Sequence, residues 1–367
     1  MKVVRLVISD CHLGTGARRG QANPYEDFHE DERLAEFIEH YSTGAYTSHE
    51  VELILNGDIF DLMKVEIDGI WPIQITEPMA VEKLRRTLEG HPRVTAALRA
   101  FVAKRGKRVT YIPGNHDIDM WFPGAQQLFR AYVAPGALAS RVRFVTSSDA
   151  YSLPEGIQIR HGHQLEAIHR FDYRKMTVPG PGGEPVLNLP WGSLWCLEVL
   201  CPAKRRRQHL DYVVPFRRFI LGSLLVDFRF TLLFCLRTIA HFLRKRLSQA
   251  QRLRDKIRIL PTVLKEEIFA IASYDDAALK ALRRTHGVHT LIVGHSHAPL
   301  IRVIEGGKQY INTGTWTRMI NLDITRLGQD TGRTYALIEY DADGQPQTSL
   351  MRWNGAARTC EPVVHAL

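Results

Sequence analysis

The chain has 367 residues, of which 45% are hydrophobic, 24% charged and 9% aromatic. This composition is typical of a globular protein and excludes a disordered or collagen-like chain. The five cysteines form no paired CxxC spacing, so neither a disulfide framework nor a structural zinc site is expected. The N-terminus, MKVVRLVISD, lacks the apolar core and cleavage site of a signal peptide. We therefore expect a cytoplasmic protein.

Apolar runs alternate with helical patterns along the first part of the chain. Buried strands are predicted over Val3–Ser9, Val51–Leu55, Arg108–Ile112, Gly156–Arg160 and Thr290–Val293. Helices are predicted over Asp31–His40 and over Glu82–Arg105, with an interruption at His91 because a residue before proline avoids helical backbone. The alternation of strand and helix indicates an α/β fold.

The pattern changes after residue 177. A Gly/Pro-rich loop over 178–192 precedes helical segments that continue to about Gly287. We interpret 178–287 as a basic, amphipathic helical cap inserted into a core formed by 1–177 and 288–367. The end of the chain returns to strands over Lys308–Ile311, Tyr335–Tyr340 and Gln347–Trp353, the last two joined by a turn at 341–344.

The positive charge is concentrated in the predicted insert. The formal net charge is +9, yet residues 201–260 alone hold 15 Lys or Arg against three Asp. The rest of the chain is therefore nearly neutral, and the insert is expected to meet an anionic partner.

The segment Phe216–Leu247 is rich in Leu and Phe but is interrupted by charges, whereas a membrane-spanning helix needs about 20 apolar residues. Arg229 and Arg237 would be costly in hydrocarbon, while a helix in the headgroup plane buries Leu and Phe and presents Arg to lipid phosphates. An anionic membrane surface, on the inner face of the cell membrane, is the expected partner. Packing on the body or on a second copy remains an alternative. Nucleic acid is less favoured because Tyr and Trp stacking platforms are few.

Polar motifs follow each of the five predicted buried strands. They are Asp10-Cys11-His12, Gly57-Asp58-Ile59-Phe60-Asp61, Gly114-Asn115-His116-Asp117, His161-Gly162-His163 and Gly294-His295-Ser296-His297. Ligands bind at the carboxyl ends of strands in open α/β sheets, so we expect these motifs to converge.

The residue types in these motifs indicate a metal site. Carboxylate, amide and imidazole ligands suit manganese, the first expectation, with iron or zinc as alternatives. The candidate metal ligands are Asp10, His12, Asp58, Asn115, His161, His295 and His297. Seven ligands are too many for one tetrahedral ion but suit two divalent metal ions about 3.5 to 4 Å apart, with Asp58 as the bridge.

The ordered motifs DxH, GDxxD, GNHD, a lone His and GHxH resemble those of the calcineurin-like metallophosphoesterases. The resemblance covers roughly Met1–His163 and His289–Thr317 and implies a four-layer α-β-β-α sandwich. It implies that one metal is held by Asp10, His12, Asp58 and His297. The other would be held by Asp58, Asn115, His161 and His295, which leaves His163 as an extra histidine.

The resemblance also implies a hydrolase that cleaves a phosphate ester or anhydride by attack of a metal-activated water. His116 would act as the general acid near the leaving group, oriented by Asp117 or Asp61. Cys11 is expected to be an inert small side chain, because no separate base is needed to activate a thiol there.

The segments ISDCHLG, LNGDIFDLM, YIPGNHD, HGHQLE and YINTGTW resemble the branch that contains the UDP-2,3-diacylglucosamine pyrophosphatases of lipid A synthesis. This implies a lipid-linked or nucleotide-linked diphosphate as substrate, with Arg18 and Arg19 as candidate phosphate clamps. That branch commonly has Arg in place of His116 and Asp in place of His163. A generic phosphodiesterase or phosphomonoesterase, or a nuclease acting on nucleic acid, therefore remains the alternative. A noncatalytic scaffold that keeps its metals for stability is the least favoured hypothesis.

Overall fold

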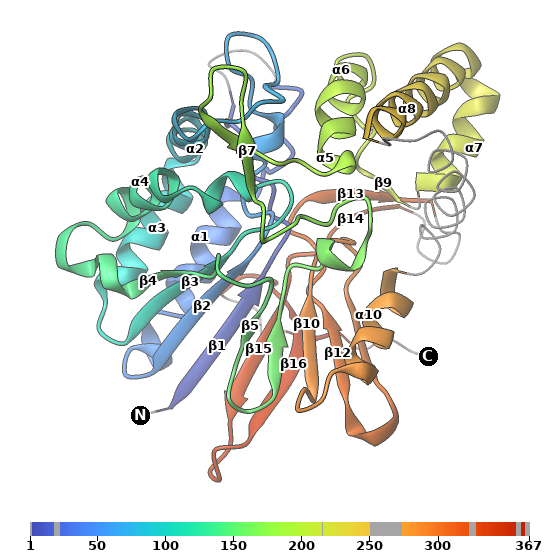
Figure 1. Ribbon diagram of the computed structural model, residues 1–367. Coiled ribbons are helices and arrows are strands. Elements are labelled where there is room, and N and C mark those ends of the chain that lie inside the picture. The colour runs from blue at the N-terminus through green and yellow to red at the C-terminus, as the bar shows by residue number, and fades with distance from the viewer. Residues whose placement is uncertain are drawn as a thin grey trace.

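Two β-sheets lie face to face between layers of helices in the computed structural model (Figure 1). The structure describes residues 2–17, 23–214, 216–249, 274–322, 328–356 and 361–363. The first sheet has the strand order β17 (Glu361–Pro362), β16 (Pro346–Arg352), β15 (Thr334–Tyr340), β1 (Val3–Ile8), β2 (Glu50–Asn56), β3 (Lys107–Ile112) and β4 (Val142–Phe144). The second has the order β11 (Leu300–Val303), β12 (Gln309–Asn312), β10 (Thr290–Val293), β6 (Ile157–Ile159) and β5 (Tyr151–Ser152).

The strands that precede the motifs run parallel within each sheet. Val7 of β1 lies opposite Ile54 of β2, which lies opposite Thr110 of β3. Ile292 of β10 lies opposite Ile159 of β6 in the second sheet. This in-register parallel pairing brings the carboxyl ends of the motif strands in each sheet to one edge.

Side chains alternate between the two faces of each strand, and this alternation builds the layers. Val7, Ile54 and Ile112 of the first sheet pack against Ile159 and Ile292 of the second. The other face of the first sheet packs on four helices, α1 (Asp31–His40), α2 (Glu77–Gly90), α3 (Pro92–Ala103) and α4 (Pro123–Val133). Helix α10 (Tyr274–Arg284) covers the second sheet. The predicted four-layer α-β-β-α sandwich is confirmed.

The predicted interruption of the second helix is also confirmed. Helix α2 ends at Gly90, and Pro92 begins α3, where its fixed φ and missing N–H cost nothing in the first turn. Short 3-10 helices lie at Gly44–Tyr46, Leu62–Lys64, Ile118–Trp121, Gly136–Arg141, His163–Leu165 and Glu305–Gly307.

The predicted insert, 178–287, contains short strands as well as the expected helices. The expected loop contains a hairpin of β7 (Thr177–Pro179) and β8 (Pro185–Leu187). Helical segments follow as α5 (Trp191–Trp195), a π-helix (Cys196–Leu200), α6 (Cys201–Lys204), α7 (Phe216–Val226) and α8 (Phe228–Gln249). Residues 250–273 lie outside the described part of the chain.

A short strand in the insert attaches it to the end of the chain. Strand β9 (Val213–Val214) pairs in parallel with β13 (Arg318–Asn321), which pairs with β14 (Gly328–Thr331). Helix α10 was predicted as part of the insert, but its Leu279 and Leu282 pack with Leu291 of β10 and Tyr310 of β12. Of the helices that the structure describes, none has the length and apolar character that crossing a bilayer requires.

Candidate metal centre

The predicted ligands stand directly after the strands of the two facing sheets. Backbone bonds tie the segments together where the strands end: the Asp10 N–H donates to the Gly57 carbonyl at 3.1 Å, and the Gly294 N–H donates to the His161 carbonyl at 2.7 Å. The Asn56 side chain joins the two sheets by donating to the Arg160 carbonyl at 3.1 Å. The convergence predicted from the sequence is therefore observed.

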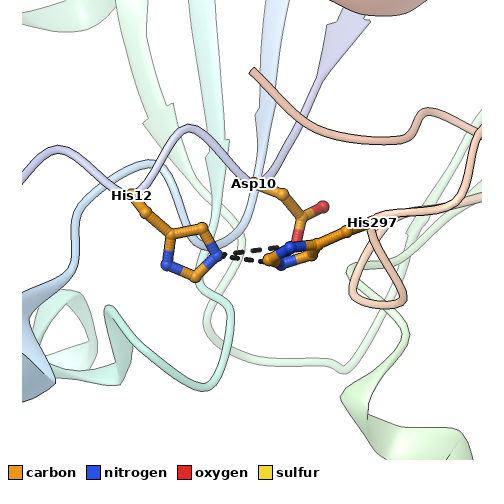
Figure 2. Close-up of side chains that lie close together, drawn as sticks. All are labelled: Asp10, His12 and His297. Carbon is orange, nitrogen blue, oxygen red and sulfur yellow. Dashed lines mark hydrogen bonds and ion pairs between the residues drawn. The ribbon is translucent and has the colours of Figure 1, made fainter. Parts of the chain in front are cut away.

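One group of ligand atoms comes from Asp10, His12 and His297 (Figure 2). His297 Nε2 lies 3.3 Å from Asp10 Oδ1 and 3.1 Å from His12 Nε2. His12 Nε2 lies 3.9 Å from the same carboxylate oxygen. Two imidazole nitrogens and one carboxylate oxygen thus point to a common centre, an arrangement that suits a divalent cation.

Asp58 connects this group to a second one, which contains His161 and His295. Asp58 Oδ2 lies 3.1 Å from His161 Nε2 and 3.9 Å from His12 Nε2. A single carboxylate oxygen therefore faces both groups. This is the position that a carboxylate bridging two cations would occupy.

Among the described residues, the buried atoms without a hydrogen-bond partner include two that belong to candidate ligands, Asn115 Oδ1 and His161 Nε2, the second of which contacts Asp58 only as an ion pair. His161 Nδ1 donates to the Asn56 carbonyl at 2.9 Å, so Nε2 is the ring nitrogen that faces the site and that a cation would meet. A buried polar atom left without a partner costs roughly 1 to 3 kcal/mol. A cation would satisfy both atoms, so the donor set fits the metal ions expected from the sequence.

Glu166 was not predicted as part of the site, yet it holds one of the ligands. His295 Nε2 lies 3.0 Å from Glu166 Oε2, and the His295 backbone N–H donates to Asp10 Oδ2 at 2.9 Å. Carboxylates commonly orient metal-binding imidazoles in this way. His169 lies beside both, with its ring centroid 5.2 Å from that of His295. The only sequence signal was the position of both residues shortly after the motif that contains His161.

Five of the seven candidate ligands have a positive φ, a backbone conformation that is rare for residues with a side chain. The angles are 53° for Asp10, 53° for His12, 51° for Asp58, 71° for His295 and 60° for His297. Such conformations cost of order 1 to 3 kcal/mol each and gather at functional sites. The backbone is therefore strained at the places where ligands must be aimed.

Two glycines allow the segments to approach closely. Gly57 has a φ of 77°, and a Cβ there would lie 2.5 Å from Cγ of His161. A Cβ at Gly294 would lie 2.3 Å from Asp10 Oδ2. Any side chain at either position would displace a candidate ligand.

The charge of the site favours cation binding. Burial raises the pKa of the Asp58 carboxyl, but His161, His116 and His12 outweigh it and hold that pKa well below its usual range. Burial likewise opposes ionisation of Asp10, yet His161 and His297 lower its pKa. Both carboxylates are therefore ionised at neutral pH.

Asp61, and not Asp117, is the partner of His116. His116 Nδ1 donates to Asp61 Oδ1 at 2.9 Å. Burial disfavours the imidazolium, but Asp61 and Asp58 outweigh it and raise the pKa of His116 to about 10. Asp117 is fully buried and accepts bonds from Tyr111 and from backbone N–H groups, including that of Gly114 at 2.6 Å. Asp117 therefore fixes the loop that contains Gly114, whereas Asp61 orients the imidazole of His116.

Two further residues of the motifs take structural positions. The thiol of Cys11 is buried, and burial raises its pKa well above the usual range, as expected for an inert side chain. His163 is fully buried against Phe171, with Nε2 3.2 Å from the Tyr173 hydroxyl. Burial and the neighbouring His161 hold the pKa of His163 well below its usual range.

A cavity of about 340 Å³ opens over the candidate ligands. The candidate ligands that line it include His12, Asp58 and Asn115, and Leu200 and Phe216 of the insert also line it. His116 has a side chain that is 21% exposed and lines the cavity. The predicted phosphate clamps, Arg18 and Arg19, lie outside the described residues.

A buried ionic cluster joins the insert to this site, and no sequence motif indicated it. Lys64 Nζ lies 2.7 Å from Asp61 and 2.5 Å from Asp211, and it also pairs with Asp27. Lys204 Nζ lies 2.6 Å from Asp27 and 2.8 Å from Asp211. Lys204 and Asp211 belong to the insert, whereas Asp61 bonds to His116, so the insert is linked to His116 through two carboxylates and a lysine.

Comparisons with known proteins agree with this geometry. A model of the calcineurin-like phosphoesterase family matches residues 4–208. A comparison with curated protein sequences found no match.

Solved structures give low similarities. A predicted phosphoesterase from Streptococcus pneumoniae is 12% identical, with 99% of this chain and 97% of that chain covered and a TM-score of 0.29. A dimetal phosphatase from Danio rerio is 12% identical, with coverages of 96% and 99% and a TM-score of 0.36. A 5'-nucleotidase precursor from Thermus thermophilus is 13% identical, with coverages of 95% and 54% and a TM-score of 0.34.

Proposed function

The chain belongs to the calcineurin-like phosphoesterase family, and from this premise we propose that it hydrolyses a phosphate ester or pyrophosphate bond in a lipid-linked or nucleotide-linked diphosphate. The family makes it a metal-dependent phosphoester hydrolase.

We assign the seven converging side chains to two divalent cations. Asp10, His12 and His297 would hold one cation, and Asn115, His161 and His295 the other. Asp58 would be shared, because its Oδ2 faces His12 and His161. When bound, the cations would lower the pKa of a water molecule and offset charge on the phosphoryl oxygens.

His116 would donate a proton to the leaving oxygen. Its Nδ1 is occupied by Asp61, which leaves Nε2 for the substrate, and its side chain reaches the cavity. The Asp61 carboxylate keeps the imidazole protonated and fixes its orientation. Glu166 would hold His295 in place through the 3.0 Å contact to Nε2.

The observation that carries the substrate class is the composition of the cavity wall. Candidate metal ligands line the cavity, and Leu200, Phe216 and Met319 are among its other lining residues. A charged diphosphate would meet the cationic centre, while an apolar portion of the same molecule would meet these side chains. UDP-2,3-diacylglucosamine, suggested by the resemblance of the motifs, combines these two features.

A substrate panel tests the proposal. Purified protein with Mn²⁺ is incubated separately with UDP-2,3-diacylglucosamine, an aryl phosphodiester, nucleotides and DNA, and products are identified by mass. We expect release of UMP and the lipid phosphate, at a rate that exceeds that for the other substrates. Hydrolysis of the aryl ester alone would contradict the proposed substrate class and indicate a generic phosphodiesterase. Cleavage of DNA alone would indicate a nuclease.

The variant Asp58→Ala separates metal catalysis from background. It should abolish hydrolysis of every substrate in the panel. Asp68→Ala is the matched control, because Asp68 has the same φ of 51° but is exposed and away from the candidate ligands. Full activity in the Asp58 variant would refute the assignment of the metal centre.

A further inference from the structure

Helix α8 exposes an apolar stripe. The exposed fractions are 39% for Leu232, 52% for Leu236, 54% for Ile239 and 36% for Leu243. Their spacing of four, three and four residues places them on one face of the helix. A stripe of this kind is the part of an amphipathic helix that leaves water when a partner is present.

The opposite face of α8 is already used for packing. Phe234 is buried, His241 Nε2 lies 2.7 Å from Glu198 Oε2, and Trp195 donates to Thr238 Oγ1 at 3.1 Å. The exposed stripe therefore faces away from the body of the protein. In Figure 1, α7 and α8 pack together at one end of the molecule, above the two sheets.

The apolar surface continues onto α7 and the turn that joins the helices. Leu221 is 65% exposed, Leu225 88%, Val226 86% and Phe228 57%. Single exposed apolar residues are ordinary on a protein surface, but a contiguous group marks an interaction site. Helices α7 and α8 contact each other, and their exposed apolar residues are hereafter called the α7–α8 surface, namely Leu221, Leu225, Val226, Phe228, Leu232, Leu236, Ile239 and Leu243.

Positive charge flanks this surface, and negative charge is nearly absent from it. The stretch 216–249 contains a single acidic residue, Asp227, which pairs with Arg207 at 2.6 Å. A cavity of about 480 Å³ beside α8 is lined by apolar side chains and by five arginines, namely Arg205, Arg206, Arg207, Arg229 and Arg237. Within the described residues, no ion pair involves the side chains of Arg206, Arg229 and Arg237.

We propose that the α7–α8 surface docks on an anionic lipid bilayer. The helices would lie in the headgroup plane, with Leu and Ile inserted among the acyl chains and the unpaired arginines bound to lipid phosphates. A second copy of the chain would bring like-charged arginines together, and nucleic acid would leave the apolar stripe in water. None of the residues of this surface lines the cavity over the metal centre. A test of lipid binding is therefore independent of a test of the proposed substrate.

Vesicle co-sedimentation tests the proposal without any measurement of catalysis. Full-length protein is mixed with phosphatidylcholine vesicles that contain about 30% phosphatidylglycerol, or none, at low and high salt. We expect binding to the anionic vesicles that weakens as salt rises. The variant Leu232→Gln/Leu236→Gln/Ile239→Gln should lower the partition coefficient by at least about tenfold, because the inserted apolar area is lost.

The variant Arg229→Gln/Arg237→Gln should lower the partition coefficient by at least about tenfold and reduce its salt dependence. Matched controls are Val303→Gln, at a site 70% exposed on β11, and Arg99→Gln/Arg105→Gln, at exposed sites on α3 and just beyond it. Both controls should bind as the wild type does. All substituted positions are exposed, and an unchanged circular dichroism spectrum would confirm folding.

Three results would overturn the proposal. The first is equal binding of wild type and both α7–α8 variants to anionic vesicles. The second is a wild-type dimer in sedimentation velocity that becomes a monomer in the variant Leu232→Gln/Leu236→Gln/Ile239→Gln. In that case the α7–α8 surface would bind a second copy of the chain. The third is that the wild type binds no vesicles but binds duplex DNA in a salt-sensitive way, and that only Arg229→Gln/Arg237→Gln loses this DNA binding.

Discussion

The carboxylate of Asp61 receives a hydrogen bond from His116 Nδ1 at 2.9 Å and, on its other oxygen, an ion pair from Lys64 at 2.7 Å. Lys64 and His116 hold the pKa of this buried carboxyl well below its usual range, although burial acts in the opposite direction. Asp61 is therefore a fixed negative charge. Asp61 keeps the His116 imidazole protonated and fixes the orientation of its ring.

Substitution of this pair should impair protonation of the leaving group. We expect His116→Gln to lower kcat by about 10² to 10⁴-fold and Asp61→Asn by a smaller factor, since the imidazole remains but loses its orienting charge. The loss should be greater for an alkyl phosphodiester than for a nitrophenyl ester, whose leaving group needs little protonation. Steady-state kinetics with both esters, together with metal content, would check this. An equal loss for both esters would contradict a general-acid role.

The close approach at Gly57 predicts a specific loss of metal. In Gly57→Ala, the new Cβ would meet Cγ of His161 at 2.5 Å, so His161 must move away from Asp58. We expect the bound metal measured by elemental analysis to fall from two ions to about one per chain, with activity reduced by at least about 10². Gly69→Ala is the control, because Gly69 has the same φ of 77° with nothing within 4 Å of the added Cβ. Two bound ions in the Gly57 variant would refute this account.

The sequence predicted the strands of the site because each apolar run is followed at once by polar ligand residues. Strand β10 and helix α1 have the predicted bounds. Helix α1 is amphipathic, and its apolar positions Leu34, Phe37 and Ile38 are buried as the 3.6-residue period requires. These features are local, so a single sequence is enough to find them.

What could not be predicted depends on contacts between distant segments. Strand β9 has two residues and forms because β13, more than 100 residues later, lies beside it. The choice between Asp61 and Asp117 as partner of His116 follows from how two loops fold against each other. Lys204 reads as one of four successive basic residues, and only the fold shows that it is buried. Pattern and propensity carry no information about such partners.

The ionic cluster predicts that the insert contributes to the stability of the core. Lys204→Met would leave Asp27 and Asp211 with Lys64 as their remaining cation, and we expect the free energy of unfolding to fall by about 3 to 5 kcal/mol. Lys204→Met/Asp211→Leu removes one charge of each sign and should recover part of this loss. Urea denaturation would measure both.

Lys280→Met, at an exposed position on α10, is the control and should have no effect beyond about 0.5 kcal/mol. A similarly small effect of Lys204→Met would show that the cluster contributes nothing to stability.

The pH dependence of stability should report on His91, which links α1, the segment after the first motif and the start of α3. His91 lies 2.8 Å from Asp31 and 3.3 Å from Glu26, and its side chain is 3% exposed. Burial lowers its pKa, but the two carboxylates outweigh burial and raise the pKa to about 9. Because the folded-state pKa exceeds the unfolded value of about 6.5, the stabilisation is complete below about pH 6.5 and is lost as the pH rises through about 9.

We therefore expect His91→Gln to reduce the free energy of unfolding by up to about 3 kcal/mol more at pH 6 than at pH 9.5, as measured by urea denaturation. The exposed His286→Gln should show no such difference, and an equal effect of His91→Gln at both pH values would mean that the imidazolium is not formed in the folded protein.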